Sequence, residues 1–235
     1  MTAGTYVFIG GGDAPFFIFL LIGAIVVAAI IFGILQGVKR RKALEAFAQQ
    51  HGLEFDRTKN THVDDEFPTL KCFHQGHSRY GCNFLKGTWQ GRRFLGFDYH
   101  YTTGSGKNQS HHSFSCVFLS SHVPLKELFI RPEGFFDKIT EFFGYDDIDF
   151  ESAEFSRAFY VKAPEKRWAY DVLHARAIEF LLNQPKFTIQ FASDCAMARK
   201  SGTFRPEQFA QAGEVLRGIL DGLPNYVLQQ QGGAT

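Results

Sequence analysis

Residues 104–107 read Gly-Ser-Gly-Lys, which are the residue types of a phosphate-binding loop. Such a loop needs a glycine five residues before its Gly-Lys pair, a Ser or Thr after the lysine, and a following helix whose first amides hold the phosphate. Those two positions are Tyr101 and Asn108 here, and a strand pattern follows. We therefore predict a flexible hairpin loop, and a looser anion site formed by its amides and Lys107 is the alternative.

Two cysteines and two histidines follow the spacing Cys-x-His-x2-His-x4-Cys: Cys72, His74, His77 and Cys82. Zinc is bound by tetrahedral sets of Cys and His, and two strands joined by a tight turn would bring these side chains together. Because the spacing matches no common zinc finger, we predict core thiols, with zinc as the alternative. Three more histidines flank the glycine-rich loop and are predicted to be solvated: His100, His111 and His112.

Five carboxylates lie within nine residues: Asp146, Asp147, Asp149, Glu151 and Glu154. Hard cations prefer carboxylate oxygens, but an EF-hand loop starting at Asp147 would need glycine and glutamate where the chain has Ser152 and Ala158. We therefore predict a solvated acidic turn. Four of its residues form a candidate patch for a basic partner: Asp146, Asp147, Asp149 and Glu151.

The remaining sequence contains no pattern typical of catalysis. It has neither a Gly-x-Ser-x-Gly nucleophile elbow nor a paired zincin motif, and no Cys and His are spaced as a nucleophile and its base. We therefore predict a protein that is not an enzyme, with no catalytic residue, no cofactor and no metal.

The first element that must position these side chains is an apolar run. Residues 16–35 carry no charge and make a helix about 30 Å long, which matches the hydrocarbon core of a bilayer. The first fifteen residues hold no Lys or Arg, which argues against a cleaved signal peptide. Four basic residues follow the run: Lys39, Arg40, Arg41 and Lys42. The positive-inside rule then predicts a bacterial inner-membrane protein with its N-terminus outside and its C-terminal domain in the cytoplasm.

Two groups of residues on this helix are candidate contact sites. Ala29, Gly33 and Gly37 recur every four residues, so they form one stripe that another membrane helix can approach closely. The alternative is that small residues are simply common in membrane helices. The four basic residues are placed to meet anionic lipid headgroups, or else they only set the topology.

Composition sets further bounds. The net charge of +1 argues against a nucleic-acid partner. The four cysteines are predicted to be free thiols because the cytoplasm is reducing. The 27 phenylalanines, most of them at strand or helix periodicity, predict a core rich in aromatic rings.

The pattern after the anchor predicts an α+β fold of antiparallel strands with three packed helices. Apolar residues alternate, as in strands, over residues 69–74, 80–89, 92–101, 112–120, 125–130, 155–161, 187–191 and 195–199. A proline opens each predicted helix, at Pro132, Pro164 and Pro206. We expect five parts: a short outer N-terminus (1–15), the membrane helix (16–35), a basic juxtamembrane helix and linker (36–66), the cytoplasmic domain (67–225) and a flexible tail (226–235).

Several short segments carry a resemblance: Ala43-Leu44 after the basic stretch, 97–99 (Phe-Asp-Tyr) with 101–108 (Tyr-Thr-Thr-Gly-Ser-Gly-Lys-Asn), 131–133 (Arg-Pro-Glu), 143–145 (Phe-Gly-Tyr) with 147–150 (Asp-Ile-Asp-Phe), and 155–157 (Phe-Ser-Arg). From about Arg40 onward the chain resembles a group of bacterial single-pass membrane proteins with a cytoplasmic α+β domain and no known activity. The resemblance implies the same topology and supplies no catalytic residue.

These observations favour a membrane-anchored accessory or structural protein. It would bind or brace a larger membrane protein complex, for example a respiratory or photosynthetic assembly, through its membrane helix and cytoplasmic domain. Its expected partners are the lipid bilayer and another membrane protein. The alternatives are a domain that senses a ligand or an ion, with or without hydrolytic activity, and a sensor of anionic lipid.

Overall fold

The computed structural model describes residues 14–134 and 147–232, and the chain divides into two compact units, residues 1–43 and 44–235. The helices of the described part are α1 (Ala14–Gln50), α2 (Val63–Glu66), α3 (Ala153–Ala158), α4 (Lys166–Val172), α5 (Ala175–Leu182), α6 (Pro206–Asp221) and α7 (Asn225–Gly232), with short 3-10 turns η1 (Lys71–Phe73) and η2 (Gly106–Asn108). The strands are β1 (Glu54–Asp56), β2 (His77–Trp89), β3 (Arg92–Thr103), β4 (Ser110–Ser120), β5 (Leu128–Pro132), β6 (Phe159–Lys162), β7 (Thr188–Ala192) and β8 (Cys195–Ser201).

The first unit is made of the apolar part of α1. In the part of the chain that the structure describes, this is the one helix long and apolar enough to cross a membrane. Its large side chains are exposed, with Phe19 at 73 % and Phe32 at 63 %. The predicted helix over residues 16–35 is therefore confirmed, although its first residues and the outer N-terminus lie partly outside the described residues.

The last turns of α1 belong to the second unit. Leu44, Phe47 and Ala48 are buried in its main core. The helix ends where Gly52 adopts a left-handed φ of +65°, and the Leu53 N–H donates to the Ala48 carbonyl at 2.8 Å, which is a Schellman cap. The second compact unit therefore starts at Leu44 and includes the last two turns of α1.

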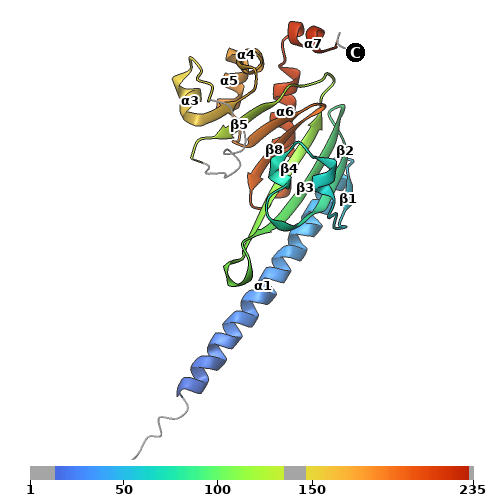
Figure 1. The fold of residues 1–235 in the computed structure, drawn as a ribbon. Helices are drawn as coiled ribbons and strands as arrows, with labels where there is room; N and C mark the ends of the chain where they lie inside the picture. The colour runs from blue at the N-terminus through green and yellow to red at the C-terminus, as the bar shows by residue number, and fades with distance from the viewer. Residues whose placement is uncertain (1–13, 135–146, 233–235) are drawn as a thin grey trace, which may run out of the picture. The chain divides into compact units, whose positions relative to one another are not determined.

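An eight-stranded sheet forms the body of this domain (Figure 1). Its strand order is β1-β2-β3-β4-β8-β7-β5-β6, and every neighbouring pair is antiparallel. Gln90 and Gly91 both have positive φ, as a two-residue hairpin turn between β2 and β3 requires. The predicted α+β class, the consecutive antiparallel strands and the 187–199 hairpin are confirmed.

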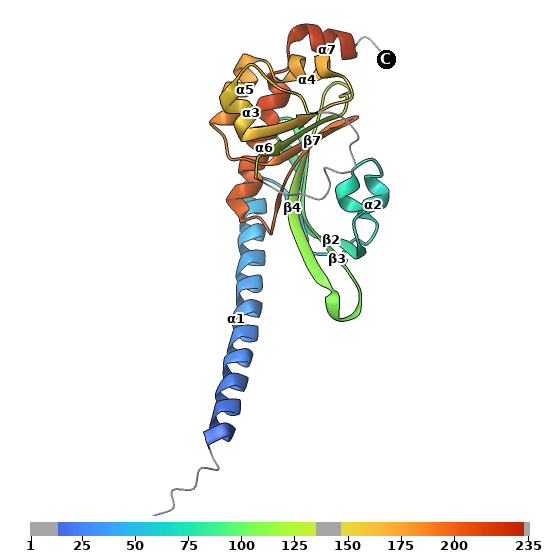
Figure 2. The same ribbon diagram turned by 60° about the vertical axis from the view of Figure 1, so that its left-hand side comes forward.

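Each face of the sheet has its own core, and Figure 2 shows α6 and α2 on opposite faces. The main core joins the sheet to α6, to the end of α1 and to α3–α5. On that face a Cβ on Gly96 would lie 2.8 Å from the Phe209 ring, so only glycine allows α6 to pack this closely. The second core lies beneath α2 and η1 and contains Phe73, Phe97 and Phe118.

A β-bulge in β2 changes which face its residues occupy. Cys82 pairs with Asp98 and Leu85 with Gly96, so Asn83 and Phe84 together oppose one residue of β3. Asn83 has a φ of +54°. As a result Phe84 enters the second core, whereas Cys82 lies on the opposite face. Strict alternation over residues 80–89 would have placed Phe84 on the same face as Tyr80 and Cys82, and the bulge moves it to the other face.

Two predicted strands are partly helical. Residues 69–74 form the turn η1, in which the Phe73 N–H donates to the Leu70 carbonyl at 3.0 Å. Residues 155–161 divide between α3 and β6. The Ser152 hydroxyl accepts the Phe155 N–H and begins α3. Phe155 lies in α3 and Phe159 begins β6, and both are buried in the core with ring centroids 5.1 Å apart.

The C-terminal helices also differ from the prediction. The single helix expected after Pro164 is two helices, α4 and α5, and the ring of His174 at their junction bonds the Gly222 carbonyl at 2.9 Å. The tail expected to be flexible from residue 226 forms α7 as far as Gly232, with Val227 buried and the Tyr226 hydroxyl donating to Asp171. The helix expected after Pro132 lies outside the described residues, and Pro132 itself ends β5.

Candidate functional site

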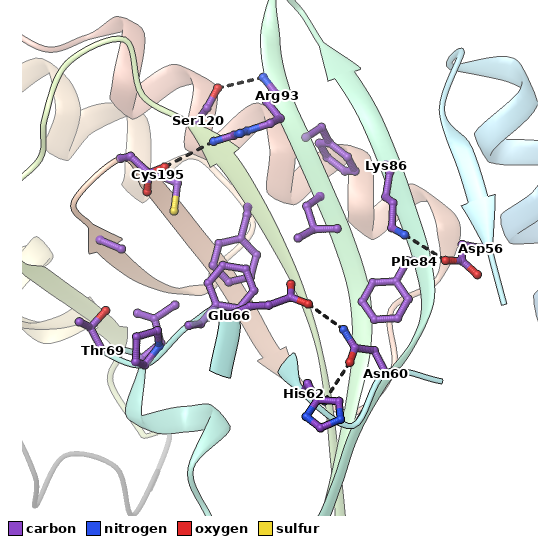
Figure 3. A pocket seen from close by; sticks show the side chains of 18 of the residues that line it. Asp56, Asn60, His62, Glu66, Thr69, Phe84, Lys86, Arg93, Ser120 and Cys195 are labelled. Carbon is purple, nitrogen blue, oxygen red and sulfur yellow. Dashed lines mark hydrogen bonds and ion pairs between the residues drawn. The ribbon is translucent and has the colours of Figure 1, made fainter. Parts of the chain in front are cut away.

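A cavity of about 990 Å³ lies on the α2 face of the sheet (Figure 3). Strands β2, β3 and β4 and the start of β8 form its base, and residues 58–62 and 66–70 form one wall. The α2–η1 segment covers only part of this sheet face, so the cavity remains open beside it. Its size suits a small ligand.

The base of this sheet pocket is apolar. Phe84 and Phe118 are buried, and Leu95 and Cys195 are partly exposed beside them. The Phe67 ring stacks on Phe118 with centroids 4.3 Å apart, so the wall is held to the base by aromatic contact. Binding of an apolar group to this surface would be favourable, because it removes apolar surface from water.

The rim of the sheet pocket is polar, and four of its charged residues form two ion pairs. The Lys86 ammonium contacts Asp56 at 2.9 Å, and Arg93 contacts Asp194 at 3.4 Å. Hydrogen bonds from Thr58, followed by the one from Lys86, lower the pKa of Asp56 to about 2. Because both signs are present and balanced, the rim favours a polar but nearly uncharged group above the apolar base.

Cys195 is the only thiol that lines the sheet pocket. Burial, followed by the nearby Asp194 carboxylate, raises its pKa to about 12. The thiol therefore stays protonated near neutral pH, and a protonated thiol is a poor nucleophile. In this pocket it contributes apolar surface.

A second cavity of about 910 Å³ contains part of the predicted acidic patch. Asp149 and Glu151 line it together with Glu154. Asp147 is turned to the backbone, where its carboxylate accepts the N–H groups of Ile148 at 2.9 Å and Val161 at 3.2 Å. Burial raises the pKa of Asp147. Asp146 lies outside the described residues, so two of the four predicted patch residues are shown together.

The predicted Cys and His groups do not converge. Within residues 18–134 and 147–230, no three His, Cys, Asp or Glu side chains are arranged to hold a metal ion. His74 bonds the Phe67 carbonyl and His77 bonds the Gly104 carbonyl. His111 and His112 bond the hydroxyls of Thr102 and Thr103, and His100 stacks on Tyr80. All four cysteines are free thiols, as predicted.

The glycine-rich segment 104–107 connects β3 to β4, as predicted for a hairpin loop. A strand begins at Ser110, so the helix that a phosphate-binding loop requires does not follow it. On α1, Ala29 and Gly33 stay exposed and Gly37 is partly exposed, and no other described atom lies within 4 Å of a Cβ placed on either glycine. The stripe and the basic residues at 39–42 remain predictions.

Sequence reasoning did not find the sheet pocket. Residues 56–66 are polar and appeared to be a linker, but they form part of its wall. The alternation that places Leu95, Phe97 and Tyr99 on one face was available from the sequence. A distant segment covers part of that face, and its packing decides which part stays open. No local pattern in the sequence predicts this.

The fold and its cavities define a class of protein: an N-terminal helix able to cross a membrane, joined to an α+β domain on one antiparallel sheet. The crystal structure of the mycobacterial trehalose monomycolate transport factor A, TtfA, is similar, with a TM-score of 0.55 and 11 % identity over 77 % of this chain and 92 % of that chain. At this identity the likeness shows the fold alone. No protein family and no curated protein matches the sequence.

Proposed function

We propose that this chain is a membrane-anchored accessory protein that binds or braces a larger membrane protein complex and is not itself an enzyme. The observation that carries the proposal is the first part of α1, which is long and apolar enough to cross a membrane and keeps its large side chains exposed. An exposed apolar helix of this length suits a membrane anchor, and a compact unit that begins at Leu44 follows it.

The basic residues at 39–42 support a domain on the cytoplasmic side of a bacterial inner membrane. The stripe of Ala29, Gly33 and Gly37 supports contact with a partner's membrane helix, because small residues let two helix backbones approach closely. The similar fold of a protein named as a transport factor is consistent with a role at a membrane.

The first test is purification of the full chain from its source membrane in mild detergent, with mass spectrometry of every protein that co-migrates. We expect stoichiometric companions. The double substitution Gly33→Ile and Gly37→Ile should release them, because the larger side chains prevent a close approach of a partner helix. It should leave the chain itself folded, because neither position contacts another described residue. The matched control, Ala24→Ile with Ala28→Ile on the opposite side of the helix, should retain them. A protein that is solitary in every preparation would contradict the proposal.

A second candidate function is the binding of a small amphipathic ligand in the sheet pocket, which its apolar base and charge-balanced rim favour. A photoactivatable monoacylglycerol, whose head group is polar and uncharged, should label residues of this pocket when it is added to the full chain in nanodiscs. Leu95→Lys on the pocket base should reduce that labelling about tenfold, as expected when a charge meets an apolar group. Ile178→Lys, which lies outside this pocket, is the control, and equal labelling in both variants would exclude the site.

A further inference from the structure

The second cavity is a groove between residues 149–154 and the helices α4 and α5. Leu173, Ile178 and Leu182 supply apolar side chains to its surface. Tyr170 stands at the groove with 47 % of its surface exposed, and its hydroxyl donates to the Asp149 carbonyl at 3.1 Å. The groove therefore offers an apolar surface and an anchored aromatic ring, which are the features of a site for an apolar side chain.

Four carboxylates surround this apolar surface: Asp149, Glu151, Glu154 and Glu179. Among the described residues, those that line the groove include no Lys, Arg or His. No salt bridge joins any of the four to another described residue, whereas several carboxylates elsewhere have basic partners, for example Asp56 with Lys86 and Glu165 with Lys126. The groove is thus a region of concentrated negative charge, and it attracts cations.

The combination of charge and apolar surface restricts the kind of ligand. Nucleic acid and anionic lipid headgroups would be repelled by the carboxylates. A lone metal ion would leave the apolar surface unused, and no three carboxylates converge among the described residues. An amphipathic polypeptide segment fits both properties, with apolar residues at helical spacing against Ile178 and Leu182 and with Lys or Arg beside the carboxylates.

We propose that the groove docks the Lys/Arg-rich cytoplasmic segment that flanks a membrane helix of a partner protein. Such segments combine basic residues with the apolar end of a membrane helix, because the positive-inside rule concentrates Lys and Arg there. This choice of partner rests on the proposed accessory function. The chain's own basic stretch is a poor occupant, because the adjoining Leu44 and Phe47 are already buried in the domain core.

The test measures binding of a fluorescent, helical Leu/Lys peptide of about 18 residues, with Leu at i, i+3, i+4 and i+7, to the full chain in phosphatidylcholine nanodiscs. The groove variant is Glu151→Gln, Glu154→Gln and Glu179→Gln. The matched control changes three exposed carboxylates elsewhere, Glu54→Gln, Glu127→Gln and Glu207→Gln, and so has the same net charge. Fluorescence anisotropy reports the Kd, and thermal unfolding shows that each variant is folded.

We expect the groove variant to weaken peptide binding about tenfold or more and the control variant by less than about twofold, because only the groove carboxylates contact the peptide. Ile178→Ala should also weaken binding, because the apolar contact is lost. Equal weakening in both triple variants, unchanged binding in the groove variant, or no effect of Ile178→Ala would each overturn the proposal. The peptide measurement needs no native partner, so its failure is distinct from a failure to find companions in the source membrane.

Discussion

A fragment that begins at Leu44 is expected to fold, whereas a fragment that begins at Phe67 is expected to remain unfolded or to aggregate. The longer fragment keeps Leu44, Phe47 and Leu53 in the main core, and it keeps β1 along the edge of β2. Removing a large buried side chain costs about 2–5 kcal/mol, so losing three approaches the whole stability of a typical domain, about 5–15 kcal/mol. Loss of β1 also exposes an edge strand.

Circular dichroism and thermal unfolding of the two fragments measure this difference. Within the full chain, Leu44→Asp should lower the melting temperature strongly, because it places a charge in the core. Gln49→Asp, an exposed position on the same helix, is the matched control and should have little effect. A cooperative unfolding transition in the fragment that begins at residue 67 would show that the domain folds without the end of α1 and without β1.

Substitutions at the contact between Gly96 and Phe209 should be among those that lower the stability of the domain most. Phe209→Ala is expected to lower the free energy of unfolding by about 3–5 kcal/mol, because the ring is completely buried. Gly96→Ala is expected to cost about 1–3 kcal/mol through overpacking, since its methyl group would lie 2.8 Å from that ring. The ring of Phe204 lies beside that of Phe209, with centroids 5.2 Å apart, and limits how far the Phe209 ring can move away from the added methyl group.

The double variant Gly96→Ala with Phe209→Ala separates this contact from general damage. The added methyl group enters space that the missing ring leaves, so the double variant should lose less stability than the sum of the single variants, by about 0.5–3 kcal/mol. Trp89, whose indole N–H donates to Glu214 on α6 at 2.9 Å, gives a fluorescence signal for the unfolding of this layer. If the loss of stability in the double variant equals the sum of the losses in the single variants, the two residues are not in steric contact.

Elements with a local repeat could be predicted from the sequence. The apolar run in α1, the alternation of Leu95, Phe97 and Tyr99, and the stripe of Phe209 and Leu216 on α6 each reflect one period over a few residues. The turn between β2 and β3 follows from Gly91, because glycine tolerates the positive φ that such a turn requires. In such segments the side chain and its neighbours decide the structure before any distant contact forms.

Elements whose local pattern fits two structures could not be predicted in the same way. Phe155 and Phe159 satisfy strand alternation and helical spacing equally well, but the cap from Ser152 places Phe155 in α3 whereas Phe159 begins β6. After the bulge at Asn83, the residues of β2 lie on the opposite faces from those that strict alternation gives. The side-chain amide of Asn83 donates to Asp98 on the neighbouring strand at 2.9 Å. That contact depends on the register between two strands, which no single segment specifies.

By itself the sequence determined a helix able to cross a membrane, its basic flank and an antiparallel α+β domain, because hydrophobic periodicity and charge are local properties. Only the tertiary structure decided that the domain begins at Leu44 and that the carboxylate of Glu179 joins Asp149, Glu151 and Glu154 around one groove. Residues 149–154 and α5 are distant in the chain. Their packing sets which charges remain unpaired and which apolar side chains remain uncovered, and these are the properties on which binding depends.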